Sequence, residues 1–174
     1  IKLHSNGHYL KKENLEILEK ALTEAKVGDQ HDPPKGPMTE SADVSDDAYI
    51  DGMRAQKTVE LLEELSKGSD QPFFLAVGMS KPHLPFVAPK KYWDLYNRER
   101  MPLAEFRQRA KNTNRLAYHN SGEMRSFAAP GWEYKSDKNN QLLIDKDSQK
   151  KLIHGYYACV TFIDFQIGKI LKKL

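Results

Sequence analysis

Lys81 and His83 are the residues whose type and position best suit chemistry. They follow the continuous apolar run 73–77, which predicts a strand buried on both faces, as in a parallel sheet. Ligands of open α/β sheets bind beyond the carboxyl ends of strands, and Pro82 and Pro85 restrict the backbone there. Lysine would offer an anion a point charge, and histidine would donate a hydrogen bond or act as a general acid. The alternative is a surface loop with a solvated histidine.

A second polar cluster lies in the glycine-containing stretch 118–125. His119, Asn120 and Arg125 could line a polar pocket that binds substrate. A surface loop is the alternative for this stretch too.

Three groups of possible metal ligands fit a site poorly. Counted from Asp43, a calcium loop of the EF-hand kind needs glycine sixth and glutamate twelfth, but Gly52 is tenth and Arg54 twelfth. The acids from Asp43 to Asp51 are therefore predicted to cap a helix. His4 and His8 have a helical spacing, but the residues between them, 5–7 (SNG), disfavour a helix. The pair His31/Asp32 is followed by two prolines and has no third ligand, so we expect no metal site at either pair.

Cys159 is the single cysteine, so the chain has no internal disulfide and no cysteine-based zinc site. It lies on the apolar face of the predicted last helix, which favours a buried small hydrophobic side chain over a nucleophile.

The positioning elements follow from apolar periodicity and from proline and glycine. Helices are predicted from 14 to about 28, from about 45 to 68, from 89 to 96, near 103–110, and from 148 to the end. Residues 28–47 hold three prolines and many acids and are predicted to be a loop. Helices around a buried strand indicate an α/β architecture with at least one parallel strand.

Composition excludes several classes of protein. The 174 residues suit one domain or one lobe of a larger one. The 27 basic and 24 acidic residues are interspersed and give a net charge of +3, which disfavours nucleic-acid binding. No apolar run is long enough to span a membrane, and the first residues lack the order of a signal peptide. Because the sequence starts at Ile1, we expect a processed or excised piece.

Four segments carry a resemblance to a known family. The most specific runs from Pro72 to Phe86, PFFLAVGMSKPHLPF. It resembles the sulfatases of the alkaline-phosphatase superfamily, in the iduronate-2-sulfatase-like branch. Residues 49–52 (YIDG), 117–123 (AYHNSGE) and 155–168 (GYYACVTFIDFQIG) are similar to the same branch. Residues 40–174 match better than 1–39.

The resemblance implies part of an alkaline-phosphatase-like sheet flanked by helices, incomplete in this chain. It also implies hydrolysis of sulfate esters of a sulfated sugar or glycan by a formylglycine nucleophile, with calcium balancing the sulfate charge. His83 corresponds to the pocket histidine that binds sulfate and protonates the leaving oxygen, with Lys81 beside it. His119, Asn120 and Arg125 fall where the branch places part of its substrate pocket. A periplasmic, secreted or lysosomal location is implied.

The sequence lacks two parts of the family's active site. It contains no C/S-x-P/A-x-R motif for formylglycine, and the family's metal ligands are expected before Ile1 and after Leu174. The chain is therefore predicted to be an interior segment that is inactive alone and that associates with the rest of the sulfatase or with itself. Two alternatives are a phosphate or phosphonate ester hydrolase of the same superfamily and a non-catalytic module that binds sulfated glycans.

Overall fold

The computed structural model describes residues 9–24, 35–68, 71–106, 108, 110–118, 121–128, 135–138 and 141–174. Its helices are α1 (Lys12–Glu24), α2 (Ile50–Gly68), α3 (Lys90–Trp93), α4 (Gly122–Arg125) and α5 (Lys146–Leu171). Its strands are β1 (Lys35–Pro37), β2 (Thr39–Ala42), β3 (Phe86–Pro89), β4 (Phe127–Ala128), β5 (Lys135–Ser136) and β6 (Leu142–Leu143). Short 3-10 turns span Asp46–Ala48, Arg98–Arg100 and Arg115–Ala117.

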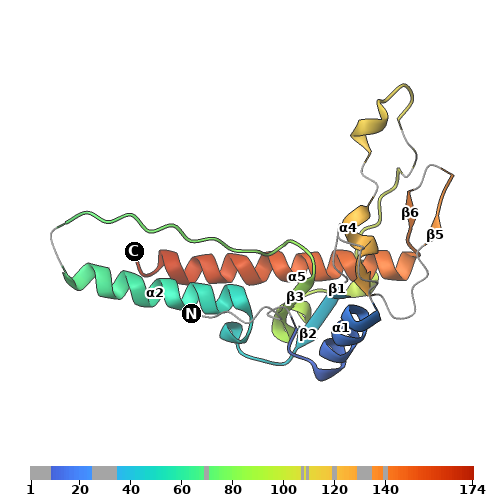
Figure 1. Cartoon of the computed structure of the whole chain (residues 1–174). Coiled ribbons are helices and arrows are strands. Elements are labelled where there is room, and N and C mark those ends of the chain that lie inside the picture. The colour runs from blue at the N-terminus through green and yellow to red at the C-terminus, as the bar shows by residue number, and fades with distance from the viewer. Residues whose placement is uncertain are drawn as a thin grey trace.

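Helix α5 is the longest element and extends along most of the molecule (Figure 1). Asp145 caps its start by accepting a hydrogen bond from the Ser148 N–H at 2.9 Å. Buried residues recur at steps of three or four along one face: His154, Ala158, Cys159, Phe162 and Gln166. This confirms the helix predicted from 148 onward.

Helix α2 lies beside α5 in Figure 1, and the two helices contact each other. Ala55 and Leu62 are buried as the periodicity predicts, whereas Leu65 is 38% exposed. The helix starts later than predicted because Asp46–Ala48 form a separate 3-10 turn. Gly52 is required here, since a Cβ atom would lie 1.8 Å from the Asp46 carbonyl oxygen.

Ser45 and Asp46 do not cap a helix as predicted. Ser45 makes no side-chain cap bond. The buried Asp46 carboxylate instead accepts from the Tyr92 hydroxyl at 2.9 Å and contacts the ammonium groups of Lys169 and Lys91 at 2.8 and 2.7 Å. Burial alone would raise the pKa of Asp46, but the hydrogen bonds outweigh burial and lower it to about 2. Asp46 therefore connects the start of α2 to α3 and α5.

Three small sheets accompany the helices within the described ranges. Strand β1 pairs with β4 and β2 with β3, both in parallel, whereas β5 and β6 are antiparallel. Parallel pairing is therefore confirmed, but the prediction that 28–47 is a loop is wrong for 35–42. Its prolines and glycine suggested irregular backbone, yet Pro37 is the last residue of β1, and in β2 every second residue is buried.

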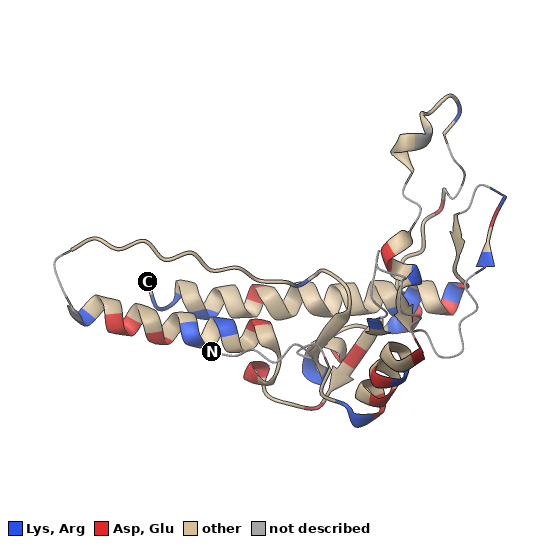
Figure 2. Ribbon diagram, viewed as in Figure 1, with Lys and Arg blue, Asp and Glu red and all other residues tan. Residues whose placement is uncertain are grey.

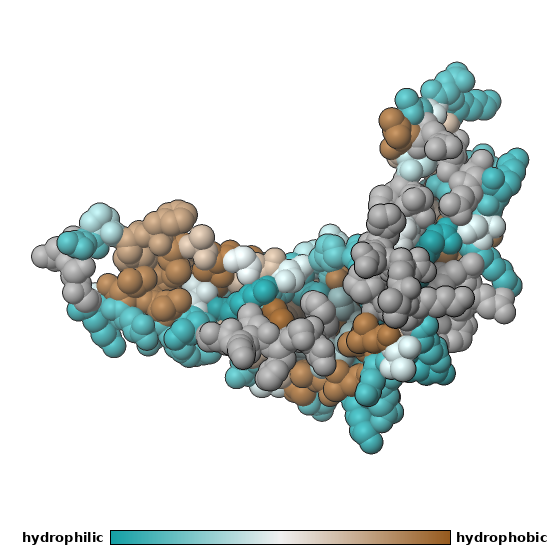
Figure 3. Space-filling view, in the orientation of Figure 1, coloured by the Kyte–Doolittle hydropathy of each residue, from teal (hydrophilic) through white to brown (hydrophobic). Residues whose placement is uncertain are grey.

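Residues 73–78 do not form the predicted buried strand. They are extended alongside the two long helices, yet no backbone hydrogen bond joins 73–79 to the rest of the described chain (Figure 1). Phe74 is 93% exposed, and an apolar patch marks this region in Figure 3. A strand needs a neighbour to pair with, which an apolar run cannot supply alone.

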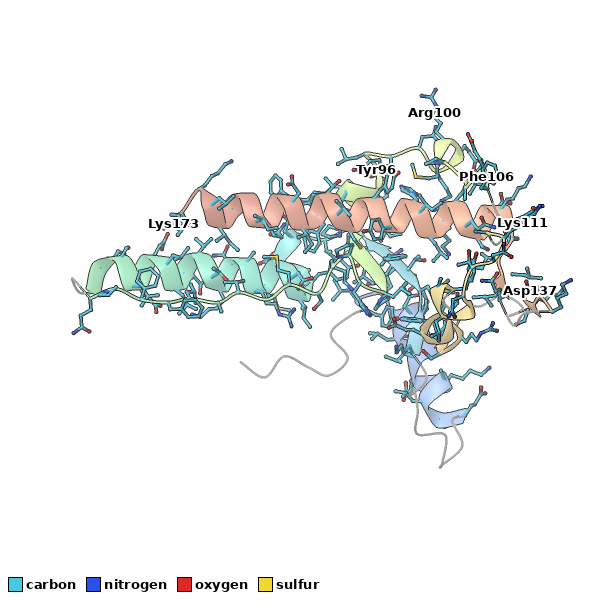
Figure 4. All side chains as sticks on the ribbon, turned by 90° about the horizontal axis from the view of Figure 1, so that it is seen from above. Tyr96, Arg100, Phe106, Lys111, Asp137 and Lys173 are labelled. Carbon is cyan, nitrogen blue, oxygen red and sulfur yellow. The ribbon has the colours of Figure 1, made fainter. Side chains whose placement is uncertain are left out.

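Two shorter predictions are also corrected. Helix α3 has four residues, although the sequence predicts a helix over 89–96. The described residues of 103–110 contain no helix, and a 3-10 turn at Arg98–Arg100 lies just before them. Figure 4 shows Tyr96 beside α5, where its hydroxyl contacts that of Thr161.

The core lies where β3, α3 and α5 meet. It includes the buried side chains of Val87, Tyr92, Trp93, Cys159 and Phe162. Glu40 in β2 is also buried and accepts hydrogen bonds from the Leu10 and Lys11 N–H groups and the Tyr49 hydroxyl. The start of α1 is thereby fixed to β2.

Candidate active site

The turn that carries Lys81 and His83 is held by the first turns of α2. The Asp51 carboxylate is 2% exposed and accepts hydrogen bonds from the Ser80 N–H at 3.0 Å and the Lys81 N–H at 2.8 Å. Arg54 donates to the same carboxylate at 2.9 Å and to the Ser80 hydroxyl at 2.8 Å. Because charged hydrogen bonds are stronger than neutral ones, this contact fixes where the turn begins.

Lys81 points into the turn. Its ammonium donates to the carbonyl oxygens of His83 at 2.9 Å and Pro85 at 2.7 Å, and the residue is buried. Burial lowers the pKa of Lys81, which the nearby Asp51 charge partly offsets. The sequence predicts contact with a bound anion, whereas the structure places the ammonium on the backbone around His83.

His83 points outward from the turn, and its side chain is 65% exposed. Its Nδ1 lies 2.7 Å from the Leu84 carbonyl oxygen. A carbonyl oxygen only accepts, so Nδ1 must carry the proton, and Nε2 is the nitrogen that faces outward. An imidazole oriented in this way can present Nε2 to a ligand or a leaving group.

Glu123 lies next to that nitrogen. Its Oε2 is 3.5 Å from Nε2 of His83, and its Oε1 accepts from the Lys35 ammonium at 3.0 Å. The Lys35 ammonium also lies 5.1 Å from the ring centroid of Phe127. The Lys35 ammonium and the His83 ring therefore lie against the same carboxylate on the surface beside the turn.

Strand pairing builds this contact. Lys35 opposes Phe127 in the parallel β1–β4 pair, and its N–H donates to the Ser126 carbonyl at 2.7 Å. Ser126 in turn donates through its N–H and its hydroxyl to the Glu123 carbonyl, at 3.1 and 2.6 Å. The end of α4 is thereby fixed beside β1.

The structure places Glu123, which lies within the second polar stretch, beside His83. His119 and Asn120 lie outside the described residues, and Arg125 lies on α4 two residues after Glu123. Asp51 and Glu123 contact the turn and its histidine, and Lys35 contacts Glu123, but none of the three is a predicted site residue. Glu123 lies within the polar stretch that the sequence analysis singled out, whereas Lys35 gave no signal because its segment is predicted to be a loop.

The remaining candidates do not form a site in the described chain. The described residues contain no group of three or more His, Cys, Asp or Glu side chains that could hold a metal ion. His4, His8, His31 and Asp32 lie outside the described residues. Cys159 is fully buried, and burial raises the pKa of its thiol to about 12, as expected for a structural cysteine.

A groove of about 480 Å³ lies away from His83, between α2 and the extended segment. Met53, Leu61, Leu75 and Val77 give it a largely apolar lining. Basic and acidic residues alternate along the ribbons of α1 and α2 (Figure 2). None of the helices in the described ranges is both long and apolar enough to cross a membrane.

Comparison with known proteins identifies the family. A family model named Sulfatase matches residues 7–174. This chain belongs to the sulfatase family. It is 32% identical over 141 residues to iduronate 2-sulfatase of Mus musculus. It is 31% identical over 140 residues to iduronate 2-sulfatase of Homo sapiens. Each of these two alignments covers 76% of this chain and 24% of the relative. A sulfatase of Formosa agariphila is 30% identical over 66% of this chain and 20% of its own length. The sulfatase chain described here thus spans about a quarter of the length of these curated relatives.

Proposed function

We propose that this sulfatase chain takes part in hydrolysing the sulfate ester of a sulfated carbohydrate, with His83 in the active site. The observation that carries the proposal is the His83 ring, which is exposed and held by the Leu84 carbonyl so that Nε2 faces outward. The family match and the names of the relatives support sulfate over phosphate as the group removed.

His83 would act as a general acid in this reaction. With both ring nitrogens protonated, Nε2 gives its proton to the ester oxygen as the S–O bond breaks, while Nδ1 keeps its hydrogen bond to Leu84. Lys81 would act as a positioning residue, since its ammonium binds the carbonyl oxygens on both sides of Leu84. We place His119, Asn120 and Arg125 in the surrounding substrate pocket.

The residues present do not fit a formylglycine or a calcium ion. The sequence has no C/S-x-P/A-x-R motif, and the described residues offer no cluster of metal ligands. A formylglycine would supply the nucleophile and calcium would balance the sulfate charge; we propose that other parts of the protein hold both. The 174-residue chain alone should therefore release no sulfate, and we expect the whole protein to be periplasmic, secreted or lysosomal.

We further propose that the chain forms part of an alkaline-phosphatase-like sheet flanked by helices. Residues 73–79 support this, because they are extended and their backbone has no hydrogen-bond partner in the described chain. The exposed Phe73 and Phe74 would become buried in such a sheet. Association with the rest of the protein or with a second copy would provide the neighbouring strands.

Two isosteric variants of the full-length protein test the role of His83. His83→Asn keeps a donor near Nδ1 for Leu84, and His83→Gln keeps a donor near Nε2; neither amide can act as a general acid. We expect both to reduce sulfate release from p-nitrophenyl sulfate by about 10²- to 10⁴-fold, the range of general acid catalysis.

Three outcomes would contradict the proposal. Wild-type rates in both variants would remove His83 from the reaction. Faster hydrolysis of p-nitrophenyl phosphate than of the sulfate by the wild-type protein would indicate a phosphate ester hydrolase. Salt-sensitive binding of a sulfated glycan without any hydrolysis would indicate a binding module.

A further inference from the structure

We propose that Glu123 is the positioning residue that keeps His83 protonated and facing outward, and that Lys35 limits this effect by sharing the carboxylate. The inference rests on the proposed function for its role in catalysis. The interaction itself is independent of that function and can be tested without activity.

The hydrogen bond to Leu84 determines which protonation state of the His83 ring can interact favourably with the Glu123 carboxylate. With the Nδ1 proton on that carbonyl, the neutral ring turns an Nε2 lone pair toward the carboxylate, which cannot donate to it when ionised. Only the doubly protonated ring can direct a proton from Nε2 toward Glu123, 3.5 Å away. The carboxylate therefore favours the charged ring, which is the form that a general acid needs.

Lys35 acts on the same carboxylate in the opposite sense. Its ammonium lies 3.0 Å from Oε1, so it neutralises part of the charge that would otherwise stabilise the His83 cation. The contact is partly exposed, with 29% of the Lys35 side chain and 36% of the Glu123 side chain accessible. Solvent screening therefore keeps both effects moderate.

Two of the other charged groups near the turn have contacts of their own, and a third lies on α4 itself. The Lys81 ammonium binds two backbone carbonyls, and Arg54 binds Asp51 and Ser80. Arg125 lies on α4 with Glu123. Glu123 and Lys35 remain the pair whose contacts the structure places at the outward edge of His83.

Chemical modification of His83 tests the pair directly. Diethyl pyrocarbonate acylates the neutral ring and not the imidazolium, so its rate at about pH 6 reports the neutral fraction. In the full-length protein, mass spectrometry of the peptide containing His83 gives that rate. Compared with the wild type, we expect Glu123→Gln to react about two- to fivefold faster and Lys35→Met to react more slowly, as for a partly exposed ion pair.

A matched control variant and a measurement at a second pH distinguish an effect of charge on the modification rate from an effect of damage to the turn. Glu99→Gln removes a comparable surface partner, that of Lys150 at 2.9 Å, and should leave the rate unchanged. At about pH 8, where an ordinary imidazole is neutral, all variants should react like the wild type. The proposal would be overturned if the modification rate of Glu123→Gln rose equally at both pH values or did not change at all. It would also be overturned if the rates of Glu123→Gln and Lys35→Met changed in the same direction.

The pH profile of sulfate release connects the pair to the reaction. Glu123→Gln should shift the high-pH limb, where the general acid is lost, to lower pH, and Lys35→Met should shift it to higher pH. If the wild-type protein releases no sulfate, the proposed function fails. The modification rates still test whether Glu123 and Lys35 affect the protonation of His83. If sulfate is released but neither limb moves, the role of Glu123 in catalysis is refuted.

Discussion

The Asp51 carboxylate accepts a hydrogen bond from the Lys81 backbone N–H at 2.8 Å, across 30 residues of sequence. It receives the Ser80 N–H at 3.0 Å as well, so one buried side chain of α2 determines where the His83 turn begins. The turn is therefore positioned by a helix and not by its own prolines alone.

Replacing this carboxylate should destabilise the protein. Asp51→Asn turns one acceptor oxygen into an NH₂ donor that faces backbone N–H groups in a buried site. We expect a loss of about 1–3 kcal/mol in the free energy of unfolding, measured by urea titration. Asp47→Asn is the matched control, because Asp47 is exposed in the preceding 3-10 turn. Equal stability of the two variants would show that Asp51 does not hold the turn.

Two glycines of α5 should respond to alanine with opposite signs. A Cβ atom on Gly155 would lie 2.7 Å from the Trp93 ring and 2.9 Å from the Phe86 Cβ atom, so Gly155→Ala should cost about 1–3 kcal/mol through overpacking. Nothing lies within 4 Å of a Cβ on Gly168, and Gly168→Ala should stabilise the helix by about 0.5–1 kcal/mol. Thermal melts of both variants check the signs. Destabilisation by Gly168→Ala, or none by Gly155→Ala, would contradict the packing of α5.

Sequence periodicity predicts the helices, because each of them is stabilised by an apolar face whose pattern is visible in its own sequence. The sequence predicts the long helices α2 and α5 because apolar residues recur every three or four positions in both segments. The segment 73–78 has an equally clear apolar signal but is not a strand, since a strand depends on a neighbour that the signal does not contain. Strand β2 was missed for the converse reason, because its pairing with β3 overrides an unfavourable local composition.

The candidate site was predictable in part. His83 could be recognised from its place in a specific motif, and Glu123 lies within a polar stretch that was singled out. The contact of Lys35 with Glu123 was not predictable, because it spans 88 residues and depends on the β1–β4 pairing. The inward direction of Lys81 was also missed, since sequence spacing does not show that nearby backbone carbonyls need a donor.

The stabilisation provided by Asp46 should disappear at low pH. Its pKa is lowered to about 2 in the folded protein, against about 3.9 for an ordinary aspartate. A lowered folded-state pKa adds stability that is complete above about pH 4 and is lost as the pH falls toward 2. Wild type should therefore exceed Asp46→Asn in urea midpoint at pH 7, and the difference should shrink between pH 4 and 2.5. A difference that does not change with pH would mean that the contacts with Lys91 and Lys169 are not electrostatic.

Cys159 should be unreactive until the protein unfolds. Its side chain is fully buried in the face of α5 that packs on β3, and its thiol lies 3.6 Å from the Val87 carbonyl oxygen. Because burial raises its pKa to about 12, almost no thiolate is present near neutral pH. Since the chain has a single cysteine, Ellman's reagent at pH 8 reports this thiol alone in the 174-residue chain. We expect no reaction in buffer and one thiol per chain in urea, with the urea midpoint of reactivity matching that of unfolding. Fast reaction in buffer would place Cys159 at the surface and contradict the packing of α5 on β3.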